Sequence, residues 1–219
     1  MNIKWIGHSC FLITADSGKT LLTDPYDSRA YLGTLLYRQV DLSPDICAIS
    51  HGHPDHAAVK YLGGPPHVID TEGEYDIDGF DIRGVATFHD ASEGAQRGGN
   101  TVFVIRVDGV SVCHLGDLGH RLSARQSEAI GAIDVLLIPV GGYFTIDAAV
   151  ATAVWEQLGP PPVTIPMHFR NEKCLFQIEG VDKFLAGKSG VDKPGESEIA
   201  LMQENLSGAP KIVVLEPAN

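Results

Sequence analysis

The chain has 219 residues, 44% of them hydrophobic, and a formal net charge of −12 at pH 7. This length and hydrophobic share suffice for the core of one large domain or of two small ones. The acidic charge disfavours nucleic acid as a partner because it repels a phosphate backbone. No apolar run reaches the roughly 18 residues of a membrane span, no secretory signal is predicted, and four scattered cysteines without a CxxC pair favour a reducing, cytoplasmic location.

The first half of the chain predicts mainly strands. Short apolar runs rich in β-branched residues place them near residues 2–6, 10–14, 19–23, 46–50, 67–70, 74–78 and 81–88. The first three are expected to form an antiparallel meander because turns such as Asp16-Ser17-Gly18 separate them. A short helix is predicted from Asp55 to Leu62, where Gly63-Gly64-Pro65-Pro66 ends it.

Residues 25–44 form a long connection between the third and fourth strands. Such connections are often lids, binding loops or interfaces, and the tyrosines and leucines here could form an apolar substrate wall or the contact of a homo-oligomer. The alternative is a short helix packed on the body, since Leu32, Leu35 and Leu36 have helical spacing.

The second half of the chain predicts both strands and helices. Strands are expected near residues 101–107, 110–115, 134–140, 163–167 and 211–215. Helices are expected over residues 123–130, where Ser123 and Gln126 have capping-box spacing, and over residues 147–158 and 181–185, followed by a mobile polar loop over residues 187–198. Two strand-then-helix halves, about 1–100 and 101–219, predict one α/β domain in which two sheets pack together with helices outside.

The densest group of metal-type side chains is His51-Gly52-His53-Pro54-Asp55-His56, which directly follows a predicted strand. Four more candidates each follow a strand of their own: Asp24, His89, Asp117 and His168. The carboxyl ends of strands collect ligands in layered α/β folds, so we expect these side chains to converge. Imidazoles and carboxylates in this proportion suit Zn²⁺, or Mn²⁺ or Fe²⁺ where the metal supply differs.

The spacing inside the six-residue cluster predicts two ions. Side chains alternate along an extended segment, so His51 and His53 point the same way and one ion can bind both. If a helix starts after Pro54, Asp55 and His56 leave that line and can bind a second ion beside the first. Paired hydrolytic sites hold their ions about 3.5–4 Å apart.

The pattern His51-x-His53-x-Asp55-His56, with Asp24 before it and His89, Asp117 and His168 after it, resembles the metallo-β-lactamase superfamily. Four flanking pieces resemble small zinc-dependent hydrolases related to ascorbate-6-phosphate lactonase: Gly7-His8-Ser9-Cys10-Phe11, Thr23-Asp24-Pro25, His114-Leu115-Gly116-Asp117 and Ile165-Pro166-Met167-His168. The resemblance implies a four-layer αβ/βα sandwich of two mixed β-sheets with helices on the outer faces.

The same resemblance implies a set of roles for the candidate residues. One ion would be bound by His51, His53 and His89, and the other by Asp55, His56 and His168, with Asp117 bridging both. A hydroxide shared between the ions would be the nucleophile, its pKa lowered toward about 7. Asp55 would hold or relay the proton.

Several residues compete for these roles. His67 is a rival for His89, but it opens a predicted strand, whereas His89 closes one. Asp90 and Asp108 are rivals for Asp117, although a polar loop and a hairpin turn explain them.

Other side chains are candidates for supporting roles. Asp24 before Pro25 either starts a turn or orients a metal ligand by accepting its hydrogen bond. His8 and His120 are candidates for a catalytic general acid or a supporting contact. His114 suits a hydrogen-bonded position in the core as well as it suits a role in the site. Arg97 could bind a substrate anion, although a solvated arginine is the commoner case.

The expected reaction is metal-dependent hydrolysis of a small ester, lactone or phosphodiester. By comparison with superfamily members, secreted β-lactamases, thioesterases of the glyoxalase II type and nucleases fit less well, because this chain lacks an export signal and the length for their extra domains. The alternative is a non-catalytic metal-binding or sensor protein with the same fold, since a fold does not establish a substrate.

Overall fold

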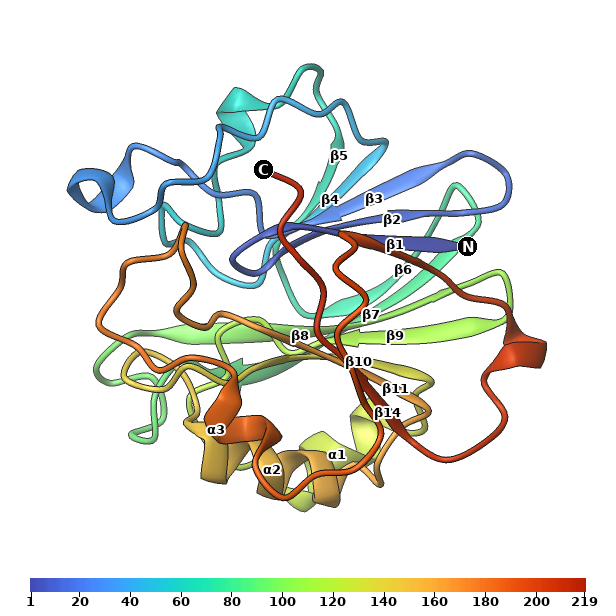
Figure 1. Ribbon diagram of the computed structural model, residues 1–219. Coiled ribbons are helices and arrows are strands. Elements are labelled where there is room, and N and C mark those ends of the chain that lie inside the picture. Colours follow the sequence, from blue (N-terminus) through green and yellow to red (C-terminus); the bar gives the residue numbers. More distant parts are fainter.

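The computed structural model describes residues 1–219 and contains two β-sheets that pack face to face (Figure 1). The smaller sheet has six strands in the order β13-β1-β2-β3-β4-β5. Their bounds are Asn2–Gly7 for β1, Cys10–Thr14 for β2, Thr20–Thr23 for β3, Ile46–Ala48 for β4, His67–Ile69 for β5 and Glu198–Ala200 for β13. The predicted antiparallel meander β1-β2-β3 is present, whereas β3, β4 and β5 run parallel, so the sheet is mixed.

The larger sheet has eight strands in the order β12-β14-β11-β10-β9-β8-β7-β6. Their bounds are Gly73–Ile77 for β6, Phe80–Phe88 for β7, Gly99–Val107 for β8, Val110–His114 for β9, Val135–Pro139 for β10, Val163–Met167 for β11, Val191–Asp192 for β12 and Lys211–Val213 for β14. Strands β9, β10 and β11 are parallel, and β7 runs in their direction because both β7 and β9 are antiparallel to β8. The carboxyl ends of β7, β9 and β11 therefore meet at one edge.

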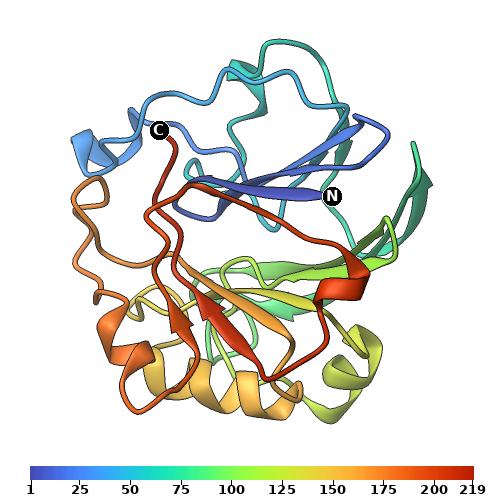
Figure 2. The ribbon, with the colours of Figure 1, turned by 45° about the vertical axis from the view of Figure 1, so that its right-hand side comes forward.

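The three α-helices lie on the outer face of the larger sheet (Figures 1 and 2). They are α1 (Ala124–Ile130), α2 (Ala148–Gln157) and α3 (Asp182–Leu185), close to the predicted ranges. Ser123 caps α1 in the predicted capping box with Gln126, and Asp147 caps α2 by accepting from the Val150 backbone. The predicted α/β sandwich of two mixed sheets is confirmed.

The main hydrophobic core fills the space between the two sheets and beneath the helices. Strands β10 and β11 are buried at every residue, which agrees with their almost continuously apolar sequences, because a strand covered on both faces has no solvent side. A second core of 10 buried residues, including Tyr26, Leu35, Tyr37 and Phe176, lies under the connection between β3 and β4. No helix in the structure combines the length and apolar character that a membrane crossing requires.

The helix predicted from Asp55 to Leu62 is wrong. The chain makes one turn, in which the Ala57 backbone donates to the His53 carbonyl, and then only a 3₁₀ turn at Val59–Tyr61. The Ala58 N–H donates to the Pro25 carbonyl, and the Pro54 carbonyl accepts from Asp27. Bonds to the neighbouring segment thus take the groups that would continue the helical ladder.

The polar loop predicted over residues 187–198 contains strand β12, which pairs with β14, and leads into β13, which pairs with β1. Both strands are short and largely exposed, so they show no apolar periodicity. The prediction of an irregular segment was therefore wrong in part, because pairing partners distant in the sequence decide the structure here.

The connection over residues 25–44 contains a 3₁₀ turn at Ala30–Gly33 rather than an α-helix. Leu35 and Tyr37 are buried, whereas Leu32 and Leu36 are exposed. Tyr31 and Leu32 have φ angles of 55° and 54°, a left-handed conformation that non-glycine residues rarely adopt. The segment therefore packs on the body at its second half and projects outward at the turn (Figure 1).

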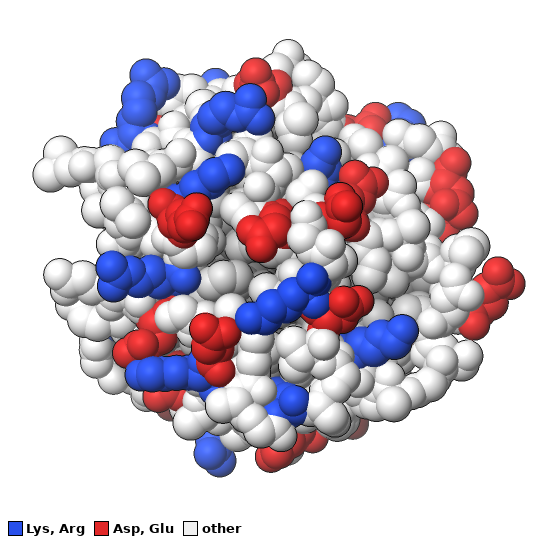
Figure 3. All heavy atoms as spheres, viewed as in Figure 1, with Lys and Arg blue, Asp and Glu red and all other residues white.

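Charge is mixed over the face of the molecule seen in Figure 3. Lysine and arginine side chains alternate there with aspartate and glutamate, and no continuous basic surface forms on this face. Nucleic-acid-binding surfaces usually gather basic residues into a patch or stripe, so this face gives no support to such a partner.

Candidate metal centre

The candidate residues from both sheets converge at the strand ends. From the smaller sheet, Asp24 follows β3, and the His51–His56 segment follows β4. From the larger sheet, His89 follows β7, Asp117 lies three residues beyond β9, and His168 follows β11. Asp24, Asp55, His56, His89, Asp117 and His168 are all buried, so these polar groups need partners of their own.

The first group of potential ligands consists of His51, His53 and His89, whose ligand atoms lie within 4.8 Å of one another. The Nε2 atom of His51 is 2.9 Å from Nδ1 of His53. As expected from alternation along an extended segment, these two side chains face the same region.

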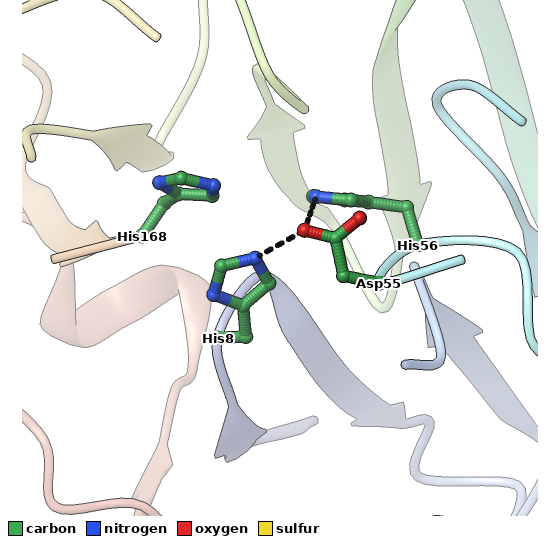
Figure 4. A group of neighbouring side chains, drawn as sticks. All are labelled: His8, Asp55, His56 and His168. Atoms are coloured by element: carbon green, nitrogen blue, oxygen red, sulfur yellow. Dashed lines mark hydrogen bonds and ion pairs between the residues drawn. The ribbon is translucent and has the colours of Figure 1, made fainter. Parts of the chain in front are cut away.

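The second group consists of His8, Asp55, His56 and His168, whose ligand atoms also lie within 4.8 Å of one another. Figure 4 shows Asp55 and His56 on one segment of the chain, with His8 and His168 approaching them from two other segments. His8 Nε2 is 3.2 Å from Asp55 Oδ2, and His56 Nε2 is 3.7 Å from the same oxygen.

Asp117 lies between the two groups. Its Oδ2 atom is 3.2 Å from His56 Nε2, 3.3 Å from His89 Nε2 and 3.4 Å from His168 Nε2. One carboxylate oxygen is thus shared by a histidine of the first group and two of the second. The acidic rivals do not reach this position: Asp90 binds the backbone of its own loop, and Asp108 binds the Asp16 backbone.

The protonation states suit metal binding. Burial opposes ionisation of Asp117, but the His168 and His56 imidazoles outweigh it and hold the carboxyl pKa well below its usual range. Burial, followed by the charge of His56, lowers the pKa of His51 to about 3, and burial lowers that of His89. At neutral pH these groups therefore have the ionised carboxylate and neutral imidazoles that metal ligation needs.

His56 differs from the other imidazoles. Burial favours its neutral form, but the Asp117 and Asp55 carboxylates raise its pKa well above the usual value. The surrounding carboxylates thus stabilise a positive charge at this point. A divalent cation held by the same donors would supply that charge in place of the proton.

Unsatisfied buried atoms provide the test of whether these residues fit a metal. Eight buried side-chain nitrogen or oxygen atoms in the structure have no hydrogen-bond partner, and five of them belong to His8, His56, His89, Asp117 and His168. Buried polar atoms nearly always have a partner, and two of these five, His56 Nε2 and Asp117 Oδ1, belong to side chains that meet between the two ligand groups, which indicates a missing ligand there. Because imidazoles and carboxylates are ligands of Zn²⁺, Mn²⁺ and Fe²⁺, the donor set fits a divalent metal.

Two glycines explain how the chain brings Asp117 close to the three histidines. Gly116 has a φ of 56°, and a Cβ atom there would lie 2.4 Å from Asn100 Oδ1. A Cβ at Gly119 would lie 2.2 Å from the Asp90 backbone nitrogen. The Asn100 side chain accepts from the Asp117 N–H at 2.8 Å. The turn that carries Asp117 is therefore packed against Asn100 before this residue and against the Asp90 backbone after it.

Asp24 lies behind His56. Its Oδ2 atom accepts from His56 Nδ1 at 2.9 Å and from the Ser50 hydroxyl at 2.6 Å, while Oδ1 accepts from the Ser50 N–H at 2.7 Å. A carboxylate in this position fixes the tautomer and orientation of a ligand imidazole, leaving Nε2 free for a metal.

Asp24→Asn is expected to weaken zinc binding about 10- to 100-fold, because loss of such a carboxylate partner typically has this effect. The measurement is competition for zinc with a chromophoric chelator. The control is Asp76→Asn, which changes an exposed aspartate on β6 outside the candidate metal centre. A zinc affinity equal to that of the wild type would show that Asp24 does not orient a ligand.

The remaining histidines differ in their surroundings. His8 is fully buried beside Asp55 and His168, with its Nδ1 unpartnered. His114 donates from Nε2 to the Ser9 carbonyl and accepts at Nδ1 from Gly116, which is the hydrogen-bonded core arrangement. The structure does not bring His120 to the cluster, because its two nitrogens bond to the backbone of Phe88 and Arg121. His67 is exposed on β5.

A small cavity opens beside the cluster. Its volume is about 180 Å³, and its lining combines His53, Asp55, His89, Asp117 and His168 with Tyr31, Arg97, Phe144 and Phe176. A larger hollow of about 890 Å³ at the start of α2 has no histidine among its lining residues. The candidate metal ligands therefore border the smaller cavity.

Tyr31, Phe144 and Phe176 were not singled out individually from the sequence. The Tyr31 hydroxyl donates to Asp55 Oδ1 at 3.2 Å, and the rings of Tyr31 and Phe144 each meet Phe176 at centroid distances of 5.6 and 5.7 Å. The only signal for Tyr31 was its place in the long connection predicted to form a substrate wall. Nothing local marks Phe144 or Phe176.

Known proteins share this sequence and architecture. A family model described as the β-lactamase superfamily domain matches residues 2–168. A protein from Thermotoga maritima, crystallised as a candidate Zn-dependent hydrolase of the metallo-β-lactamase superfamily, is 37% identical with a TM-score of 0.80, and the match covers 98% of this chain and 97% of that one. The chain therefore belongs to the metallo-β-lactamase superfamily.

Within the superfamily, the chain falls among the UPF0173 metal-dependent hydrolases. A member from Thermoplasma volcanium is 30% identical over 194 residues, which cover 77% of this chain and 83% of that protein. Igni18, a metallo hydrolase from Ignicoccus hospitalis, has a TM-score of 0.65 and covers 100% of this chain and 96% of its own, but at 23% identity it shows a shared fold only.

Proposed function

We propose that the chain is a dinuclear hydrolase that cleaves a small ester, lactone or phosphodiester. The proposal rests above all on Asp117, whose Oδ2 atom lies 3.2–3.4 Å from the Nε2 atoms of three histidines. One carboxylate oxygen between two groups of ligands is suited to bridge ions about 3.5–4 Å apart, the usual separation in paired hydrolytic sites.

The proposed ligands follow the two groups, except that His8 of the second group is not assigned as a ligand. One ion is assigned to His51, His53 and His89, the other to Asp55, His56 and His168, and Asp117 is shared. Zn²⁺ is the first candidate, and Mn²⁺ or Fe²⁺ would accept the same donors, so metal supply decides among them. Bound divalent ions would supply a Lewis acid for the scissile carbonyl or phosphoryl group and a water with its pKa lowered toward about 7.

The chain's own residues would handle the proton at Asp55. This carboxylate is held at both oxygens, by the Tyr31 hydroxyl at Oδ1 and by His8 Nε2 at Oδ2, each at 3.2 Å. Its orientation is thereby fixed toward His56. We assign Asp55 the role of holding the proton of the attacking water, and His8 the role of positioning Asp55 by donating to its Oδ2 atom.

The dimensions of the cavity support a small substrate. At about 180 Å³ it is below the range of roughly 300–1,000 Å³ that is usual for drug-sized ligands. Its aromatic side, formed by Tyr31, Phe144 and Phe176, would exclude water from the reacting end of the substrate.

Metal content and turnover together test the proposal. Protein purified with zinc or manganese supplied is expected to contain two ions per chain by elemental analysis. It is also expected to hydrolyse at least one member of a panel of small esters, lactones and phosphodiesters, to lose this activity with chelator and to regain it when metal is returned.

Fewer than one ion per chain would contradict the dinuclear centre. A full complement of metal without turnover on any substrate class would instead favour a metal-binding or sensor protein.

A further inference from the structure

We propose that the substrate carries a carboxylate group that binds Arg97, and that Asp90 is the positioning residue that holds Arg97 in place. This inference rests on the proposed hydrolase function and names the class of substrate. It concerns the part of the cavity lining where Arg97, on the loop after β7, lies beside the Phe144 ring.

Arg97 is the one lysine or arginine among the residues that line the cavity. Its guanidinium lies 5.7 Å from the centre of the Phe144 ring and makes no hydrogen bond or ion pair with the protein. This lack of a partner is informative because the chain has 28 acidic residues against 16 basic ones. Five N–H donors thus remain available at the edge of the cavity, in the planar arrangement that binds a carboxylate at two points.

The cavity favours a singly charged group over a phosphate. Asp55 and Asp117 also line it, but both are proposed metal ligands whose charges the ions offset, so the one guanidinium of Arg97 sets the charge of the substrate group that binds beside it. A single guanidinium matches the charge and planar shape of one carboxylate, whereas phosphate dianions gain from several cations. The half-buried position of Arg97 beside Phe144 reduces competition from water, which strengthens the pair.

Asp90 organises the loop that carries Arg97. Its buried carboxylate accepts four backbone N–H groups: Oδ1 from Ser92 at 2.7 Å and Gly94 at 3.1 Å, and Oδ2 from Gln96 at 3.0 Å and Arg97 at 2.7 Å. The His89 N–H closes the loop by donating to the Gly98 carbonyl at 3.0 Å. The backbone of Arg97 is therefore fixed relative to His89, a proposed metal ligand, before any substrate binds.

The charge of Arg97 is tested with two esters of the same chain length. 4-Nitrophenyl hydrogen glutarate ends in a carboxylate, whereas 4-nitrophenyl valerate ends in a methyl group. Arg97→Met keeps an unbranched side chain against Phe144 and removes the charge. It is expected to lower kcat/KM for the glutarate ester about 10- to 100-fold, as for a lost charged hydrogen bond, and to leave the valerate ester within about two-fold.

Two further variants serve as controls for Arg97→Met. Arg97→Lys is expected to recover part of the activity on the glutarate ester, because it restores the charge without the planar fork. Arg125→Met, at an exposed arginine of α1, is expected to change neither ester. Metal content should be the same in all variants, which separates an effect on the substrate from an effect on the ions.

Asp90→Asn tests the positioning role. The amide keeps one acceptor oxygen, so about half of the loop bonds remain. We expect KM for the glutarate ester to rise several-fold with kcat little changed, and the valerate ester to be unaffected. Equal losses of kcat for both esters would show that Asp90 merely supports the fold and would overturn its assignment.

The outcomes separate this inference from the proposed function. Equal kcat/KM for the two esters in the wild type, or an equal loss of both in Arg97→Met, would overturn the carboxylate site and leave the hydrolase standing. If neither ester is hydrolysed, calorimetric titration of the metal-loaded protein with glutarate still decides. Binding at least 10-fold weaker in Arg97→Met supports the site, and equal affinity overturns it.

Discussion

Replacing Asp117 with asparagine is expected to reduce metal-dependent hydrolysis by about 10³-fold or more, since the electrostatic stabilisation that bound ions supply amounts to several kcal/mol. Its Oδ2 atom is the one acceptor shared by His56, His89 and His168. Asparagine keeps the size of the side chain but removes the negative charge that two cations at close range need. The measurement is kcat/KM for the best substrate of the panel, together with metal content per chain.

Asp192→Asn is the matched control, because Asp192 lies exposed on β12, away from the candidate metal ligands. It should have the activity and metal content of the wild type. An Asp117→Asn protein that retains both two ions and more than a tenth of the activity would contradict the bridging role.

Removing the metal is expected to lower the melting temperature by about 8–16 °C. A ligand at about 1,000 times its Kd stabilises the folded state by roughly 4 kcal/mol, and each kcal/mol shifts Tm by about 2–4 °C for a chain of this size. The physical reason is the set of buried, unpartnered atoms at His56, Asp117 and their neighbours, which cost free energy when no cation binds them.

Calorimetry before and after dialysis against a chelator measures this shift, and returning zinc should restore it. In Asp117→Asn, zinc should raise Tm by less than half as much as in the wild type. Equal Tm values with and without chelator would mean that the cluster binds no metal tightly.

The strands were largely predictable from the sequence because each is a short apolar run with a turn at either end. The helices α1 and α2 were predictable for local reasons too, namely the capping-box spacing of Ser123 and Gln126 for α1 and the helical periodicity that ends at Gly159 for α2. The sequence did not predict the local structure where hydrogen bonds to distant segments determine it. The backbones of Ala58 and Pro54, for example, bond to the segment after β3 instead of extending a helix. Strands β12 and β13 exist only because distant strands pair with them.

The candidate metal centre was predictable in its membership, because a dense motif and the ends of separate strands marked its residues. Its surroundings were not. Whether His120 or His8 reached the cluster depended on turns whose conformation has no sequence signature, and His120 is bound by the backbone at Phe88 and Arg121. The direction of Arg97 likewise depends on four bonds to Asp90, which spacing alone does not reveal.

The origin of the ligand groups in both sheets has a mechanical consequence. The proposed ions would join the segment after β4 to those after β7, β9 and β11, and so close long loops of the chain as a disulfide does, restricting the unfolded state. The four cysteines are buried and unpaired. Metal coordination, rather than disulfide bonds, would therefore link the two sheets. The stability that this link adds would depend on the supply of metal instead of on the redox state of the surroundings.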